Sequence, residues 1–288
     1  MSDNQATRLG DAVERMARLV SSASDTALDR AWAWQDYHSE GARFAAFVSA
    51  TELEELAVRI GAERRDTGCP PSLAQRILAP YHASWRYLNA VLLGLDDDQG
   101  ERVAAPGAWS ARQALAHIVE ADATFYAVIR YGYERAVQGQ APARAPNEYY
   151  DALLGTEAAF AEQMAQPLAH LWRFYARHHA RVLVDLGTIG DQWIETPLLF
   201  WEEQVYPLRF RLHRFDAHLQ QHTIQIEMML GALHGLPGEG QYLARMLCRA
   251  LADVESALLG TPEILLDARV ALAETIEQRS GELAAVLA

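Results

Sequence analysis

Two histidines one helical turn apart are the residues of this sequence best placed to do chemistry. They are His218 and His222, within the stretch from Leu208 to Leu233. Side chains four residues apart share one face of a helix, with their Cβ atoms roughly 6 Å apart. Burying two imidazoles there costs free energy unless both find partners, and a metal ion satisfies both at once. The pair is therefore a candidate for half of a metal site.

The spacing of apolar residues indicates the element that carries this pair. Core-type residues recur at alternating steps of four and three, which predicts a helix packed inside a bundle. The positions are Leu208, Leu212, Phe215, Leu219, His222, Ile226, Met229 and Leu233. His218 lies on the same side of the helix, whereas His213 is turned off the shared face.

A third ligand would have to come from another helix, and a second helix with a histidine is predicted upstream. Ser110 and Gln113 form a capping-box pattern that predicts the start of a helix. One broad face of it carries Leu115, Ile118, Asp122, Phe125 and Ile129. His117 flanks that face close to its beginning.

The run PGAWSARQALAHIVEAD, followed about a hundred residues later by HLQQHTIQIE, resembles the DinB/YfiT-like family of metal-binding four-helix bundles. The resemblance covers roughly residues 71–236, with a long crossover between the second and third helices of the bundle. Its motifs are short, but their order and spacing together are specific. They are Trp109, Ser110, His117, His218, His222 and the dipeptide Ile224–Gln225.

The resemblance implies a site for a divalent metal (Zn, Ni or Fe) held by His117, His218 and His222, with a further coordination position open for water or substrate. Family members with assigned activities are mostly thiol-dependent transferases or isomerases that use a low-molecular-weight thiol. We therefore expect a metal-dependent enzyme, a thiol S-transferase acting on a small electrophile, with isomerase and hydrolase as related possibilities. No catalytic side chain is assigned. The alternative is a non-catalytic metal- or ligand-binding helical protein, with a structural metal or a protein-interaction role.

Other polar residues are weaker candidates for a place in the site. Glu120 and Asp122 are candidates for a base or a fourth ligand, and Asp216 and Gln221 for holding the imidazole tautomers. Of the adjacent His178 and His179, we expect one in the core and one facing solvent. The aromatic segment from Trp193 to Tyr206 is expected to shape the pocket.

The rest of the chain reads as all-α, because helical spacing recurs and period-two alternation does not. We expect an N-terminal helical extension at 1–70, the DinB-like four-helix bundle at 71–236 and a C-terminal helical pair at 237–288. The terminal helices either pair as a second layer or form a small companion domain. Expected helices cover 5–23, 25–38, 49–64 (capped at Ser49), 72–95 (kinked or divided at Pro80), 110–136, 167–186, 208–233, 242–259 and 262–287, with some helix in 137–166.

Composition limits the partners and the compartment. The chain has 288 residues and a net charge of −13, and all 25 basic residues are arginine. This charge argues against nucleic acid and anionic membranes as partners, and the absence of lysine excludes Schiff-base chemistry. Two distant cysteines and the lack of a signal-type or membrane-spanning apolar run predict a reduced, cytoplasmic protein. We expect a small-molecule substrate and a homodimer, with Trp32–Tyr37 and Trp193–Trp201 as candidate contact surfaces.

Overall fold

The computed structural model describes residues 2–288, with side chains from residue 7 onward. Nearly all of its regular structure is helical, and its sheet is one antiparallel pair of two-residue strands, β1 (Pro197–Leu198) and β2 (Tyr206–Pro207). The predicted all-α class is confirmed. None of the helices in the described chain is both long and apolar enough to cross a membrane.

The chain forms two compact units, which are described separately. Unit 1 comprises the chain up to Pro71, the segment Trp85–Gly94, and Leu236–Ala288. Unit 2 comprises Ser72–Ser84 and Leu95–Gly235. The helix α4 (Leu73–Leu92) contributes its first part to unit 2 and its second part to unit 1. It continues through Pro80 as one helix, so the proline does not divide it.

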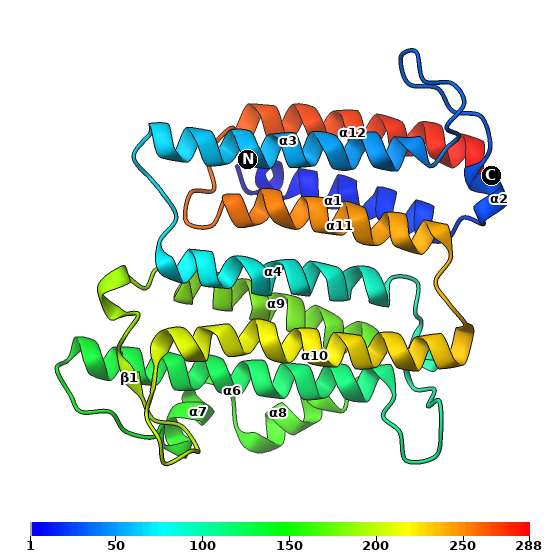
Figure 1. Ribbon diagram of the computed structural model, residues 1–288. Helices are drawn as coiled ribbons and strands as arrows, with labels where there is room; N and C mark the ends of the chain where they lie inside the picture. The colour runs from blue at the N-terminus through cyan, green and yellow to red at the C-terminus, as the bar shows by residue number, and fades with distance from the viewer. Residues whose placement is uncertain (1) are drawn as a thin grey trace. The chain divides into compact units, whose positions relative to one another are not determined.

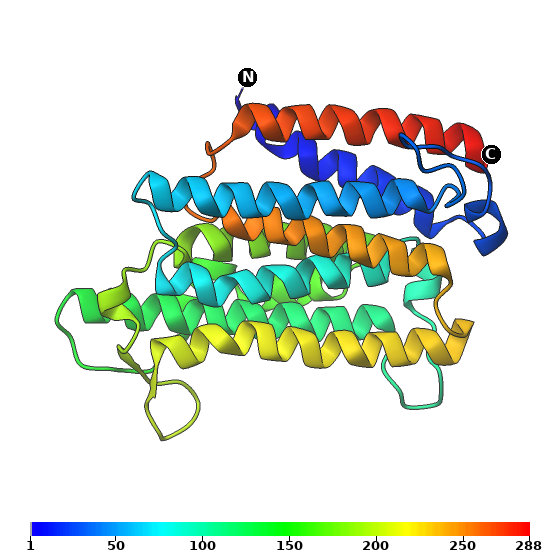
Figure 2. The ribbon, with the colours of Figure 1, turned by 45° about the horizontal axis from the view of Figure 1, so that its top comes forward.

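Unit 1 is built on α1 (Ser2–Ser21), α3 (Phe44–Asp66), α11 (Glu239–Ala257) and α12 (Leu266–Leu287), which lie side by side (Figures 1 and 2). Their buried faces share one apolar core that includes Met16, Leu53, Leu247 and Ile276. Arginines tie the helices together. Arg86 of α4 pairs with Glu14 and Glu255 at 2.5 Å each.

Two expectations for the N-terminal region were wrong. The helix expected at 25–38 is only the single turn α2 (Asp25–Leu28), because most of the following side chains are exposed and Trp32 instead donates from its indole nitrogen to Glu282 at 3.1 Å. α3 begins at Phe44, so Ser49 lies inside the helix and does not cap it. Its hydroxyl instead accepts from Arg279 at 3.2 Å.

Unit 2 contains the four-helix bundle that positions the histidines. Its helices are the first part of α4, α6 (Ala111–Val137), α9 (Leu168–Leu186) and α10 (Leu208–His234), in Figure 1 from cyan through green to yellow. The predicted crossover from α6 to α9 carries two short helices, α7 (Asn147–Leu154) and α8 (Glu157–Met164). A further turn, α5 (Asp97–Gly100), precedes α6, and the short 3-10 helix η1 (Asp191–Trp193) and the strand pair precede α10.

Candidate metal centre

The starts of α6 and α10 determine where the histidines lie. Ser110 caps α6: its Oγ accepts from the Gln113 backbone at 3.2 Å, and the Gln113 side chain accepts from the Ser110 backbone at 2.9 Å. This reciprocal cap fixes the first turn of the helix. His117 follows about two turns after Ser110. α10 starts after Pro207, whose fixed φ suits a helix entry. Its buried face then carries His218 and His222 one turn apart.

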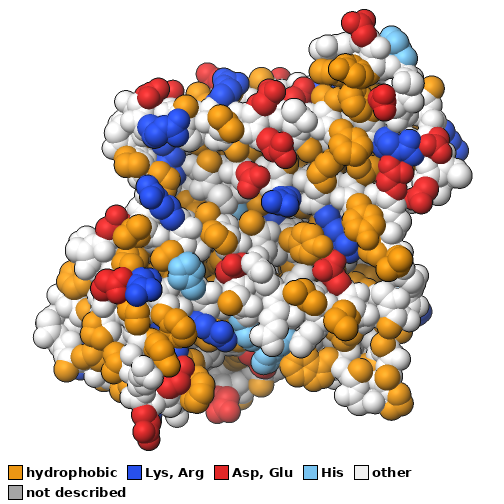
Figure 3. All heavy atoms as spheres, viewed as in Figure 1, with side chains coloured by type: hydrophobic (Ala, Val, Ile, Leu, Met, Phe, Trp, Pro, Cys, Tyr) orange, Lys and Arg blue, Asp and Glu red, His pale blue; other side chains and the backbone are white. Residues whose placement is uncertain are grey.

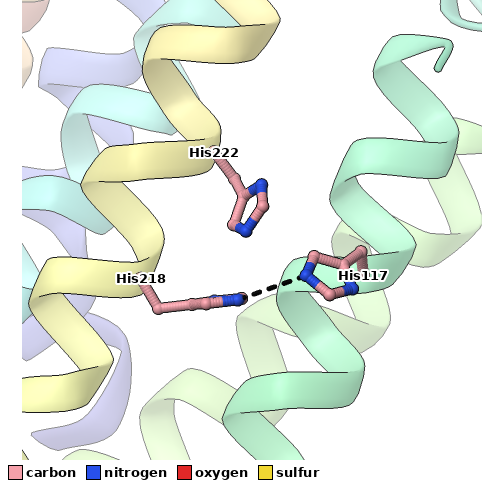
Figure 4. A group of neighbouring side chains, drawn as sticks. All are labelled: His117, His218 and His222. Atoms are coloured by element: carbon pink, nitrogen blue, oxygen red, sulfur yellow. Dashed lines mark hydrogen bonds between the residues drawn. The ribbon is translucent and has the colours of Figure 1, made fainter. Parts of the chain in front are cut away.

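The three histidines converge between the two helices. His218 and His222 point from α10 toward His117 on α6 (Figure 4). Their ligand nitrogens all lie within 4.8 Å of one another, and this is the one such group of metal-ligand side chains in the described chain. The Nε2 atoms of His218 and His117 are 3.3 Å apart. Two nitrogens bound tetrahedrally to zinc at about 2.05 Å are also about 3.3 Å apart, so the group could hold a metal ion.

The hydrogen bond between His222 and Gln225 selects the ring nitrogen that faces the group. Nδ1 of His222 lies 2.7 Å from Oε1 of Gln225. A carbonyl oxygen can only accept, so Nδ1 carries the hydrogen and the lone pair is left on Nε2. This is the arrangement by which metal-binding histidines are usually oriented. Nδ1 of His218 is buried and has no hydrogen-bond partner among the described residues.

Burial keeps the α10 histidines neutral. Burial, followed by the charges of His222 and His117, lowers the pKa of His218 to about 3. The pKa of His222 is also lowered, mainly by burial. Neutral imidazoles have a free lone pair, which a divalent metal requires. The lowered pKa values are therefore compatible with these two histidines acting as metal ligands.

Aromatic rings surround the triad, which still reaches the surface. The Trp109 ring lies 5.0 Å from the His117 ring and stacks on His222 at 6.1 Å, while Phe125 packs edge-on against His218 at 5.7 Å. His218 and His222 are buried, whereas His117 is half-buried, so the group reaches the surface at His117. The space-filling view shows histidine and apolar side chains on the visible face (Figure 3).

The model of the DinB superfamily matches residues 81–226, just over half of the chain. The chain belongs to the DinB superfamily. The match includes all three histidines, and DinB-like proteins form a metal-binding family. Comparisons with curated proteins and with solved structures gave no match.

The two carboxylates considered as additional groups do not join this DinB triad. Glu120 is exposed and outside the group. Asp122 is fully buried elsewhere in the bundle, where one carboxylate oxygen accepts from Tyr81 at 2.7 Å and from Tyr175 at 2.6 Å. Sequence spacing put Asp122 on a broad apolar face but could not reveal the tyrosines that engage it.

The structure changes the prediction for the groups that hold the imidazoles. Asp216 accepts instead from Ser84 at 2.6 Å and from Gln220. Gln221 is exposed. The residue that orients His222 is Gln225, which the sequence presented only as part of the family dipeptide. Its spacing of three residues after a ligand histidine is the signal that could have identified it.

Two further expectations about unit 2 were wrong. His178 and His179 are both buried, because α9 faces α6 with one residue and α4 with the other: Tyr126 packs on His178, and His82 lies 2.9 Å from His179. No residue of the segment Trp193–Tyr206 lines the cavity beside His222; its Phe200 packs on Phe125. It is held instead by Arg211, whose guanidinium pairs with Glu202 at 2.9 and 2.7 Å.

Proposed function

We propose that this DinB protein is a metal-dependent enzyme of the thiol S-transferase type, acting on a small electrophile. The divalent metal (Zn, Ni or Fe) would be held by His117, His218 and His222. The observation that carries the proposal is that the ligand group contains three histidines and no carboxylate or thiolate of the described chain. Structural zinc sites fill four positions with protein ligands, whereas catalytic sites use three and leave one open.

Residues around the three histidines would support the chemistry of the bound metal. A divalent metal with an open position lowers the pKa of a thiol or water that reaches it. His222 would be kept in the ligand tautomer by Gln225. Trp109 and Phe125 shield the imidazoles on two sides, which lowers the local dielectric and strengthens electrostatic interactions there.

A cobalt titration tests the proposal. Co(II) would be loaded into the protein, and 2-mercaptoethanol would be added while the visible absorption is followed. The proposal predicts that the thiol enters the open position and adds a sulfur-to-cobalt charge-transfer band, with no such band in His218→Ala. A cobalt spectrum that the thiol leaves unchanged would favour the alternative, a closed structural or non-catalytic site.

The proposal extends to partners and compartment. We propose a small-molecule substrate, a low-molecular-weight thiol as co-substrate, a cytoplasmic location and a homodimer, without nucleic acid or membrane partners. The net charge of −13 supports the absence of nucleic acid and anionic membrane partners, because a negatively charged protein repels both. For the dimer, Trp201 with 73% of its surface exposed is the better contact candidate, because Trp32 is buried in unit 1. Sedimentation velocity tests the dimer, and a monomer at micromolar concentration would contradict it.

A further inference from the structure

A cavity of about 380 Å³ opens directly beside the triad in unit 2. Its lining joins the start of α6 to the second half of α10 and consists of Trp109, His222, Gln225, Met228 and Met229. The volume lies within the usual range for small-molecule sites. Because His222 belongs to both the triad and this wall, a molecule in the cavity would lie next to the candidate metal ligands.

The wall is uncharged and mostly apolar, with His222 and Gln225 as its polar residues. The lining includes no Arg, Asp or Glu of the described chain. Met228 has 71% of its surface exposed and Trp109 has 44%. Large apolar side chains left in water beside one another commonly mark a binding surface. Methionine also adapts its shape and packs favourably against aromatic rings, and the indole face of Trp109 offers a flat surface for such a ring.

We propose that this cavity binds an uncharged apolar group of a small molecule, an aromatic ring or a short aliphatic chain, and positions the reacting part of that molecule at the histidines. The inference rests on the proposed function for its catalytic meaning, but not for the binding itself. Gln225 supplies a directional polar contact: its carbonyl oxygen accepts from His222, so its amide NH₂ is left to donate to a neutral acceptor. The cavity therefore selects amphipathic or aromatic electrophiles over small charged ones.

The test uses 1-naphthalenemethanol, an uncharged fluorescent aromatic probe, titrated into metal-free and Co(II)-loaded protein. The variant is the double substitution Met228→Gln and Met229→Gln, which keeps side-chain size while making the wall polar. The control is Val184→Thr, because Val184 is 69% exposed on α9 and outside the cavity. Cobalt affinity and oligomeric state are measured for every protein.

We expect the probe to bind wild type and Val184→Thr equally, and the double variant roughly tenfold more weakly, as expected from the lost apolar contact. Cobalt affinity should be the same in all three. Unchanged probe binding in the double variant, or no binding to wild type, would overturn the inference. So would a double variant that loses only self-association, because the patch would then be covered by a second copy. Failure of cobalt to bind would count against the proposed function alone, since the probe titration is also made without metal.

Discussion

At the level of single residues, the hydrogen bond from His222 to Gln225 determines which nitrogen the triad presents. Removing the acceptor with Gln225→Ala frees the ring to change tautomer and orientation. Loss of such a partner typically lowers metal affinity 10- to 100-fold. We expect that loss for Co(II) in a competition titration against a chelator of known affinity.

Gln221→Ala is the matched control for this change. Gln221 lies one turn earlier on α10 and is exposed, so its removal should leave cobalt affinity unchanged. Equal affinities for Gln225→Ala and wild type would show that Gln225 does not orient His222.

Asp122 makes a separate prediction about pH. Burial raises the pKa of Asp122 to about 7, against the opposing hydrogen bonds from Tyr175 and Tyr81. In the unfolded chain the same carboxyl titrates near 3.9. Its contribution to stability is therefore fully present below pH 4 and is lost as the pH rises to about 7. The three-unit difference corresponds to about 4 kcal/mol.

Asp122→Asn removes this titration, so the variant should gain stability relative to wild type by up to about 4 kcal/mol between pH 4 and pH 8. The comparison must be between the two proteins, because burial lowers the pKa of His178 to about 4 and gives stability an opposite pH dependence. Urea unfolding across this range measures the difference. A constant difference at all pH values would contradict the raised pKa.

Residue-level prediction was most informative where the signal was local. The HxxxH spacing singled out His218 and His222, and the family resemblance implied His117. The structure brings the three side chains close together, while their role as metal ligands stays a prediction. It failed where the partner came from another helix. The tyrosines on Asp122 and the burial of both His178 and His179 depend on how α4, α6 and α9 pack, which spacing along one helix does not specify.

At the level of elements, Arg211 anchors the segment before α10. Its side chain is 2% exposed, and its guanidinium pairs with Glu202 and lies over the rings of Phe200, Tyr206 and Phe210. Glu202→Ala would leave a buried cation without its anion, at a cost of about 3 kcal/mol. Arg211→Met removes the charge and refills the space. We therefore expect it to lower the free energy of unfolding less than Glu202→Ala does, although Arg211 is the more buried partner.

Urea unfolding gives the two free energies of unfolding, and limited proteolysis shows whether residues 187–207 are released. Greater destabilisation by Arg211→Met than by Glu202→Ala would mean that the stacked guanidinium matters more than charge compensation.

Element prediction was accurate for long periodic helices and poor for short segments. The helix expected at 208–233 is observed at Leu208–His234, because a continuous buried face and Pro207 define it. The expected helix at 25–38 is mostly loop, since its aromatic residues contact one another and other elements: Trp34 pairs with Tyr37 through the backbone.

At the level of the whole molecule, the use of arginine alone as the basic residue has a structural consequence. Several arginines of unit 1 are buried and make more than one contact: Arg279 pairs with Glu52 at 2.5 and 2.8 Å and also contacts Ser49. The single ammonium group of a lysine cannot make the same paired hydrogen bonds to a carboxylate as the planar guanidinium of an arginine. We expect Arg279→Lys to destabilise the protein by about 2 kcal/mol, measured by urea unfolding.

Arg59→Lys provides the control, because Arg59 is exposed on the same unit and its replacement should change stability by less than about 0.5 kcal/mol. Equal effects of the two substitutions would show that the bidentate contacts of Arg279 contribute little.

The sequence was least informative about how distant segments combine. Helical periodicity predicted the all-α class, and the motifs predicted the bundle. The pairing of the terminal helices was left open, because the apolar face of a helix does not specify which other helix packs against it. In the structure α1 packs on α11 and α12, and α3 packs on α11.

The metal content of untagged protein tests the central claim most directly. Wild type, His218→Ala and His222→Ala would be purified in parallel and analysed by inductively coupled plasma mass spectrometry. We predict close to one divalent metal ion per chain in wild type and its loss from both variants. Wild-type protein that holds no metal, even after reconstitution with Zn, Ni or Fe, would contradict the account and leave a helical bundle with buried histidines.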